Sequence, residues 1–127
     1  MFYVSVNFVS SAQSGYGIEK LHPDLPIYQI FFHLPAPVSV YDGAPSPQTL
    51  QFLKDGQAVL WKDFDIQRAV HIVQHPFWFG MASFVPQAKL VYDCMDFHAG
   101  FSNTGKSHTS AEHQLLELAD LTIVTSD

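Results

Sequence analysis

The chain has 127 residues, of which 47% are hydrophobic and only 14% are charged, and its formal net charge is −6. This length suits about one domain with a real core, and six Lys and Arg that do not cluster argue against a nucleic-acid-binding protein. A single cysteine, Cys94, excludes an internal disulfide framework and fits a reducing compartment. No apolar run approaches the roughly 20 residues that span a bilayer, and the apolar N-terminus lacks the basic flank and cleavage site of a signal peptide.

The first third of the chain predicts two strands with a loop between them. Residues 2–9 are rich in Val, Phe and Tyr, which is typical of a strand. Residues 10–26 contain two glycines and two prolines, and we expect a loop there. Residues 27–34 are aromatic and β-branched, which predicts the second strand.

A helix is expected after the proline-rich connection that follows. Ser46 before Pro47 is typical of a helix N-cap with proline at the first helical position. Gly56 is expected to weaken the middle of this helix. Five apolar residues recur at helical spacing: Leu50, Phe52, Leu53, Val59 and Leu60.

The second half of the chain alternates short strands with helical segments. The predicted elements are a strand over 69–74, a helix or helical turn over 75–84, a strand over 90–93, a helix over 107–118 with Leu115, Leu116 and Leu118 on its apolar side, and a strand over 121–125. Strands joined by crossovers predict an α/β fold of the Rossmann-like kind, a parallel sheet with helices on both faces. We expect residues 1–127 to form one partial domain of this kind, and a small self-contained α/β protein is the alternative.

Polar residues follow two of these strands. In parallel sheets, ligand-facing groups lie just past the carboxyl ends of the strands. Asp93 and Asp96 follow one predicted strand, and Ser126 follows the last one. A partly buried carboxylate there can serve as a general base, but aspartate also commonly caps loose backbone N–H groups. We favour the capping role for Asp93 and leave both roles open for Asp96.

Metal binding has weak support. His71 and His75 are four residues apart on a predicted strand, which separates them by roughly 13 Å. Cys94, Asp96 and His98 could converge after their strand, yet structural zinc sites usually contain paired clusters of ligands. We therefore predict no metal. The expected role of His71 is that of a core histidine, and His75 is expected to be held by backbone hydrogen bonds at a strand end.

Several catalytic motifs are absent from the sequence. It contains no Walker phosphate loop, no GxGxxG after a strand and no GxSxG elbow, so a serine acyl-transfer nucleophile cannot be named. The aromatic run Phe77-Trp78-Phe79 is expected to pack in the core or at an interface rather than to form a sugar platform, and Cys94 and Met95 are expected to be packing residues.

Three segments in a fixed order carry a family resemblance. VYDCMDFHAGF (91–101) is followed by SAEHQLLELADL (110–121) and by ADLTIVTSD (119–127). In this order they resemble the N-terminal domain of a two-domain GT-B-type glycosyltransferase, of the bacterial family 1 and family 4 kind that builds cell-surface polysaccharides. The resemblance is good over residues 66–127 and loose over residues 1–65.

The resemblance implies a nucleotide-sugar donor held by a C-terminal domain that lies outside this chain. A saccharide or lipid-linked acceptor would bind on the part present here, without a tightly bound metal and with no cofactor beyond the nucleotide-sugar substrate. By the same resemblance, Asp96 is the general base for the acceptor hydroxyl and Asp93 orients the loop. His75, His98 and Ser126 would line the acceptor side.

The resemblance also implies a cytoplasmic protein, with peripheral association at the inner face of the membrane as a further expectation. We expect the chain alone to be inactive because the donor domain is outside it, and we expect exposed apolar surface to favour homo-oligomers. The alternative is a non-catalytic α/β module that binds a sugar or nucleotide or serves as an interaction domain.

Overall fold

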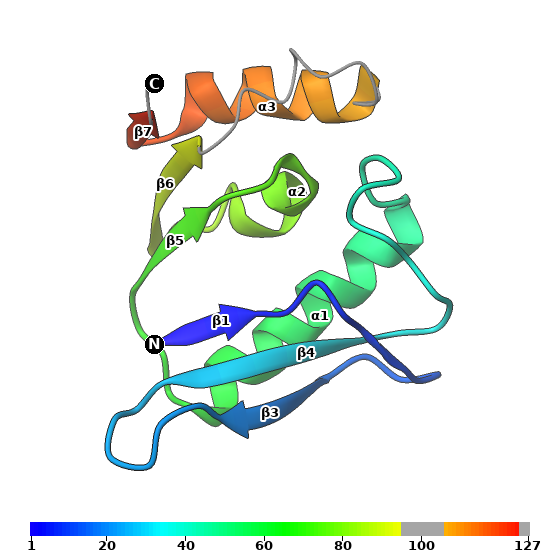
Figure 1. Cartoon of the computed structure of the whole chain (residues 1–127), viewed down its shortest axis with the longest axis vertical. Coiled ribbons are helices and arrows are strands. Elements are labelled where there is room, and N and C mark those ends of the chain that lie inside the picture. The colour runs from blue at the N-terminus through cyan, green and yellow to red at the C-terminus, as the bar shows by residue number, and fades with distance from the viewer. Residues whose placement is uncertain (95–105, 125–127) are drawn as a thin grey trace. The chain divides into compact units, whose positions relative to one another are not determined.

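The computed structural model describes residues 1–94 and 106–124, with side chains of the last helix described from Ser110 onward (Figure 1). The chain divides into two compact units. The first unit comprises Met1–Ser39 and Ser46–Asp65, and the second comprises Val40–Pro45 and Ile66–Asp127. Each unit contains a sheet and at least one helix, which confirms the predicted α/β class.

The sheet of the first unit is mixed and is built around its longest strand. Its strands are β1 (Phe2–Val4), β2 (Val9–Ser10), β3 (Tyr16–Lys20) and β4 (Tyr28–Leu34). β1 and β2 run parallel to β4, whereas β3 runs antiparallel to it. The strand predicted over 27–34 is therefore confirmed, but the one predicted over 2–9 is broken into two short strands.

The loop predicted over residues 10–26 is wrong in its centre, because β3 lies there. Tyr16 and Ile18 pair with Phe32 and Ile30 of β4 across the sheet. Gly15 has a φ of 151°, a conformation that favours glycine, and its carbonyl accepts a 3.0 Å hydrogen bond from the backbone of His33. Glycine-rich composition predicted a loop, but pairing with a distant strand supplies the backbone hydrogen bonds that a strand needs.

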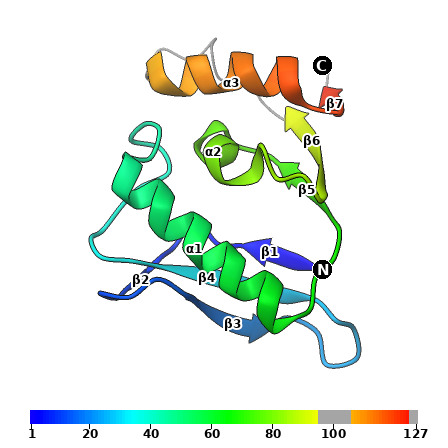
Figure 2. The same cartoon turned by 180° about the vertical axis from the view of Figure 1, so that it is seen from behind.

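Helix α1 (Pro47–Asp63) lies against β4, as Figure 2 shows. Ser46 is its N-cap, as predicted, and its side chain accepts a 3.2 Å hydrogen bond from the backbone of Thr49. A Cβ atom added at Gly56 would lie 2.9 Å from the ring of Phe32 and 2.9 Å from the carbonyl oxygen of Gly15. Gly56 therefore allows the helix to approach the sheet closely, a role that the sequence did not predict.

The sheet of the second unit is wholly parallel, with the strands in the order β5-β6-β7. Its elements are β5 (Ala69–Val73), the 3-10 turn η1 (Pro76–Trp78), α2 (Phe79–Ala82), β6 (Ala88–Cys94), α3 (Lys106–Leu118) and β7 (Leu121–Val124). The three predicted strands, the helical turn and the last helix are confirmed within a few residues of their expected ends.

The core of the second unit lies between its sheet and its helices. Val73, Tyr92 and Leu115 are buried together with Ala82, so α2 and α3 lie on the same sheet face. The prediction of helices on both faces does not hold for this sheet within residues 66–94 and 106–124. Because the strand order advances in one direction, two crossovers of the usual right hand cover one face only.

The buried side of α3 differs from the predicted one. Leu115 is fully buried, but Leu116 and Leu118 are 42% and 47% exposed. Ala111 and Glu112 are buried instead. Positions three and four residues before Leu115 share its helix face, so the geometry of the helix explains their burial and the exposure of the adjacent Leu116. Leu118 is also three residues from Leu115, but it is the last residue of α3.

Candidate functional site

The carboxyl ends of β5 and β6 are joined by a side-chain hydrogen bond. The amide of Gln74 donates to the carboxylate of Asp93 at 3.2 Å. Asp93 is half-buried, and strand alternation places it on the sheet face opposite Tyr92. This contact gives the Asp93 carboxylate a partner at the neighbouring strand end, whereas the capping of backbone N–H groups expected for Asp93 remains a prediction. Gln74 was not singled out from the sequence.

His75 begins the turn that follows β5. Its Nδ1 accepts a 3.1 Å hydrogen bond from the backbone N–H of Phe77, so the side chain caps η1. The ring of Tyr41 meets the imidazole edge-on, with ring centres 5.4 Å apart. The predicted backbone contact of His75 is confirmed. With Nδ1 acting as an acceptor, the neutral ring carries its proton on Nε2 and can donate a hydrogen bond.

The other residues near this end of the sheet are packing residues, as expected. His71 Nδ1 lies 2.8 Å from the carbonyl oxygen of Ala82, so the predicted hydrogen-bonded histidine is confirmed, although its side chain is half-buried rather than in the core. Phe77 is buried and its ring packs edge-on against Trp78, with centres 4.9 Å apart. Cys94 is buried in the core. The described part of the chain contains no group of three His, Cys, Asp or Glu side chains placed to hold a metal ion.

Three predicted site residues lie outside the described residues: Asp96, His98 and Ser126. Met95 does as well, and so do two of the three members of the Cys94, Asp96 and His98 cluster. The structure therefore describes two of the five predicted site residues, His75 and Asp93, which follow or end neighbouring strands of one sheet.

A buried polar pair lies behind these strand ends. The hydroxyl of Tyr92 donates a 2.7 Å hydrogen bond to Oε2 of Glu112, and neither side chain is exposed. Burial raises the pKa of Tyr92, and the hydrogen bond to the Glu112 carboxylate raises it further. The sequence analysis missed this pair, although Glu112 stands three residues before the buried Leu115 and so belongs to the same face of the helix.

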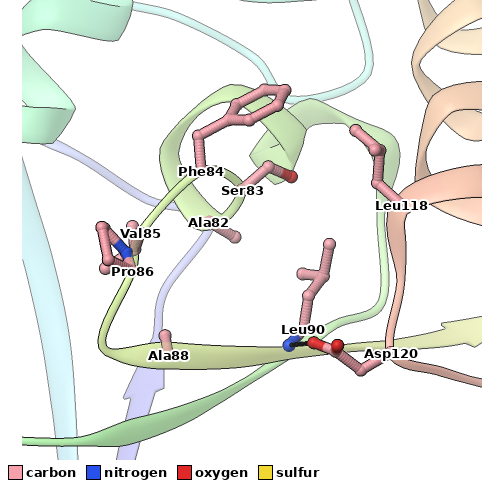
Figure 3. Close-up of a pocket in the computed structure, with 9 residues that line it drawn as sticks. All are labelled: Ala82, Ser83, Phe84, Val85, Pro86, Ala88, Leu90, Leu118 and Asp120. Atoms are coloured by element: carbon pink, nitrogen blue, oxygen red, sulfur yellow. Dashed lines mark hydrogen bonds between the residues drawn. The ribbon is translucent and has the colours of Figure 1, made fainter.

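The opposite end of the same sheet carries an open pocket of about 410 Å³ (Figure 3). Leu90, Leu118 and the turn after α2 form its apolar walls, and Asp120 is its charged residue. Asp120 Oδ2 accepts a 2.8 Å hydrogen bond from the backbone of Leu90, and its own backbone N–H donates to the Leu90 carbonyl at 2.8 Å. Asp120, just after α3, is thus hydrogen-bonded to β6, and its carboxylate has a structural role. The pocket lies at the amino end of β6, away from His75 and Asp93.

No helix in the described ranges is both long and apolar enough to cross a membrane. In comparisons with known proteins, no family model matches the chain, and neither a curated protein nor a solved structure is significantly similar to it.

Proposed function

We propose that this chain forms the acceptor-side part of a glycosyltransferase that moves a sugar from a nucleotide-sugar donor to a saccharide or lipid-linked acceptor. The finer fold assignment, a Rossmann-like N-terminal domain of the GT-B type, belongs to the same proposal. The proposal is supported by the order of the sequence segments and by the parallel β5-β6-β7 sheet, whose strands β6 and β7 contain the described strand residues of two of them.

One observation carries the location of the site. Gln74 and Asp93 join the carboxyl ends of β5 and β6, and the capping residue His75 begins the next turn. This is the edge at which open parallel sheets bind ligands. A carboxylate and an imidazole that are both held by local hydrogen bonds are suited to orient hydroxyl groups of an acceptor sugar.

The proposed chemistry needs a base at this edge. Asp96 takes the proton of the acceptor hydroxyl while the hydroxyl oxygen bonds to the anomeric carbon of the donor sugar. The bond from that carbon to the nucleotide phosphate breaks, and the nucleotide leaves with the bonding electrons. Asp93 orients the loop, whereas His75, His98 and Ser126 contact the acceptor. The donor is held by a second domain.

The test is a transfer assay of the intact gene product against a panel of nucleotide sugars and acceptors. Asp96→Asn should lower kcat by about 100-fold or more, the usual contribution of a general base, without changing the circular dichroism spectrum. Asp24→Asn is the matched control, since Asp24 is exposed in the first unit. Near-normal turnover by Asp96→Asn would remove that residue from the mechanism. Binding of sugars without any turnover of donor would favour the non-catalytic module.

A further inference from the structure

One face of the parallel sheet in the second unit is exposed and apolar. This outer face consists of Val70, Ile72, Val91, Leu121 and Ile123, with Lys89 and Asp93 on the central strand. Val70 and Ile72 are both 61% exposed, and Leu121 is 57% exposed. The face opposite carries α2 and α3. Parallel sheets are normally covered on both faces, so an outer face of this composition is a docking surface that needs an occupant.

The outer face has a defined order of side chains. Ile72, Val91 and Leu121 are in register on the three neighbouring strands and form an apolar row across the sheet. Lys89 lies two residues before Val91 on β6 and Asp93 lies two residues after it. Strand geometry places these two charges on the same face as Val91 and about 13 Å apart.

Neither charge has an ionic partner among the described residues. Lys89 is exposed, and Asp93 accepts a hydrogen bond from the uncharged amide of Gln74. Covering this face with a purely apolar surface would bury both charges unpaired, which is strongly unfavourable. An occupant that suits the face must therefore present an anion opposite Lys89 and a cation opposite Asp93, with apolar side chains between them.

We propose that the occupant is a second copy of this chain, packed face to face through a two-fold axis that runs along the Ile72–Val91–Leu121 row. This axis makes the two β6 strands antiparallel, so Lys89 faces the partner subunit's Asp93 and the reverse pair forms at the other end. The apolar row then packs on its own copy. An axis along the strands would instead bring Lys89 against Lys89 and Asp93 against Asp93.

The packing distance is compatible with these ion pairs. Sheets that pack face to face lie about 10 Å apart, a gap that an extended lysine and an aspartate can bridge together. A self-complementary patch of this kind is what an isologous dimer requires. The proposal concerns a surface of the second unit and does not depend on the glycosyltransferase assignment.

The first measurement is the mass of the purified chain by sedimentation equilibrium over a range of concentrations. We expect a reversible dimer of twice 14.2 kDa at low ionic strength. Ile72→Asp should dissociate it, because the aspartate would lie against its own copy at the centre of the interface. Lys54→Asp, on the exposed side of α1, is the control and should leave the dimer intact.

Charge reversal tests the orientation. Lys89→Asp and Asp93→Lys should each raise the dissociation constant of the dimer by about 30-fold or more. An equimolar mixture of these two variants should associate again, and so should the chain that carries both changes. Circular dichroism of each variant checks that it is folded.

Three results would overturn the proposal. The first is a chain that stays monomeric at every concentration tested. The second is a dimer that the charge reversals leave unchanged, and the third is a mixture of the two variants that fails to associate.

Discussion

The hydroxyl of Tyr92, in the middle of β6, donates a 2.7 Å hydrogen bond to the carboxylate of Glu112, twenty residues further along the chain in α3. Both side chains are fully buried. The bond joins the central strand of the second unit to the helix that covers it, within a core that also contains Val73, Ala82, Leu90, Cys94 and Leu115.

Tyr92→Phe should destabilise the chain by about 1–3 kcal/mol, since it leaves a buried carboxylate oxygen without its hydroxyl donor. Glu112→Gln should cost less, because the amide oxygen still accepts from Tyr92 and the buried charge is gone. Urea unfolding monitored by circular dichroism measures both changes. Tyr3→Phe is the control, as that ring is 54% exposed. A Tyr92→Phe variant as stable as the parent chain would contradict this prediction.

Stability should fall at alkaline pH. Burial, with the hydrogen bond to Glu112, raises the pKa of Tyr92 above the ordinary value near 10. At high pH the folded chain therefore keeps a proton on Tyr92 that the unfolded chain releases. The contribution of Tyr92 to the free energy of unfolding is complete below about pH 10 and is lost as the pH rises above it. Tyr16 acts in the same direction. Burial raises its pKa to about 12, together with Asp63, whose carboxylate accepts a 2.6 Å hydrogen bond from the Tyr16 hydroxyl.

Urea unfolding at about pH 8 and about pH 11 measures this effect. The parent chain should lose stability between the two values, and Tyr92→Phe should lose less. The same loss in the parent chain and in the variant would show that Tyr92 does not contribute.

Gly56→Ala should destabilise α1 despite the higher helix propensity of alanine. Propensity alone predicts a gain of about 1 kcal/mol. The added methyl group would, however, lie 2.9 Å from both the Phe32 ring and the Gly15 carbonyl oxygen, and overpacking of this kind costs about 1–3 kcal/mol. Ala58→Gly on the exposed side of the same helix measures propensity alone. The sign of the change in unfolding free energy decides between the two effects.

His75→Asn separates the structural role of His75 from the proposed contact with the acceptor. Asparagine can still accept the Phe77 N–H, so the variant should stay within about 0.5 kcal/mol of the parent chain, whereas His75→Ala should lose about 1 kcal/mol. If the intact gene product is a glycosyltransferase, His75→Asn should raise KM for the acceptor and leave KM for the donor unchanged. Unchanged acceptor kinetics would restrict His75 to capping.

Phe84 has a φ of 61° and is 77% exposed, a strained backbone for a bulky residue. Phe84→Gly should therefore be more stable than Phe84→Ala by about 1 kcal/mol, because both variants lose the edge-on ring contact with Phe79 but only glycine releases the strain. Thermal melts of the two variants make the comparison. Equal melting temperatures would mean that the backbone at this position is unstrained.

Local signals in the sequence predicted most of the secondary structure. Ser46 before Pro47 predicted the start of α1, and the β-branched and aromatic run before Pro35 predicted β4. β3 was missed because Gly15 and Gly17 are typical of a turn, while the hydrogen bonds that make it a strand come from β4. A prediction made from neighbouring residues does not include such a partner.

The candidate site was predicted less completely. The alternation of strands and crossovers indicated which strand ends meet, and it placed His75 and Asp93 near them. The hydrogen bond from Gln74 to Asp93 was not predicted, because it depends on the register between two strands nineteen residues apart. Asp96, His98 and Ser126 remain predictions.

By itself, the sequence determined the α/β class and, from β4 onward, the order of the strands and helices, since periodicity, caps and turn residues act over a few neighbouring positions. Only the tertiary structure decided that Gly56 is a point of close approach, that Glu112 is buried while Leu116 is exposed, and that α2 and α3 cover the same face of the sheet. These outcomes depend on contacts between residues far apart in the chain, and packing, rather than local preference, selects among the arrangements that the sequence pattern allows.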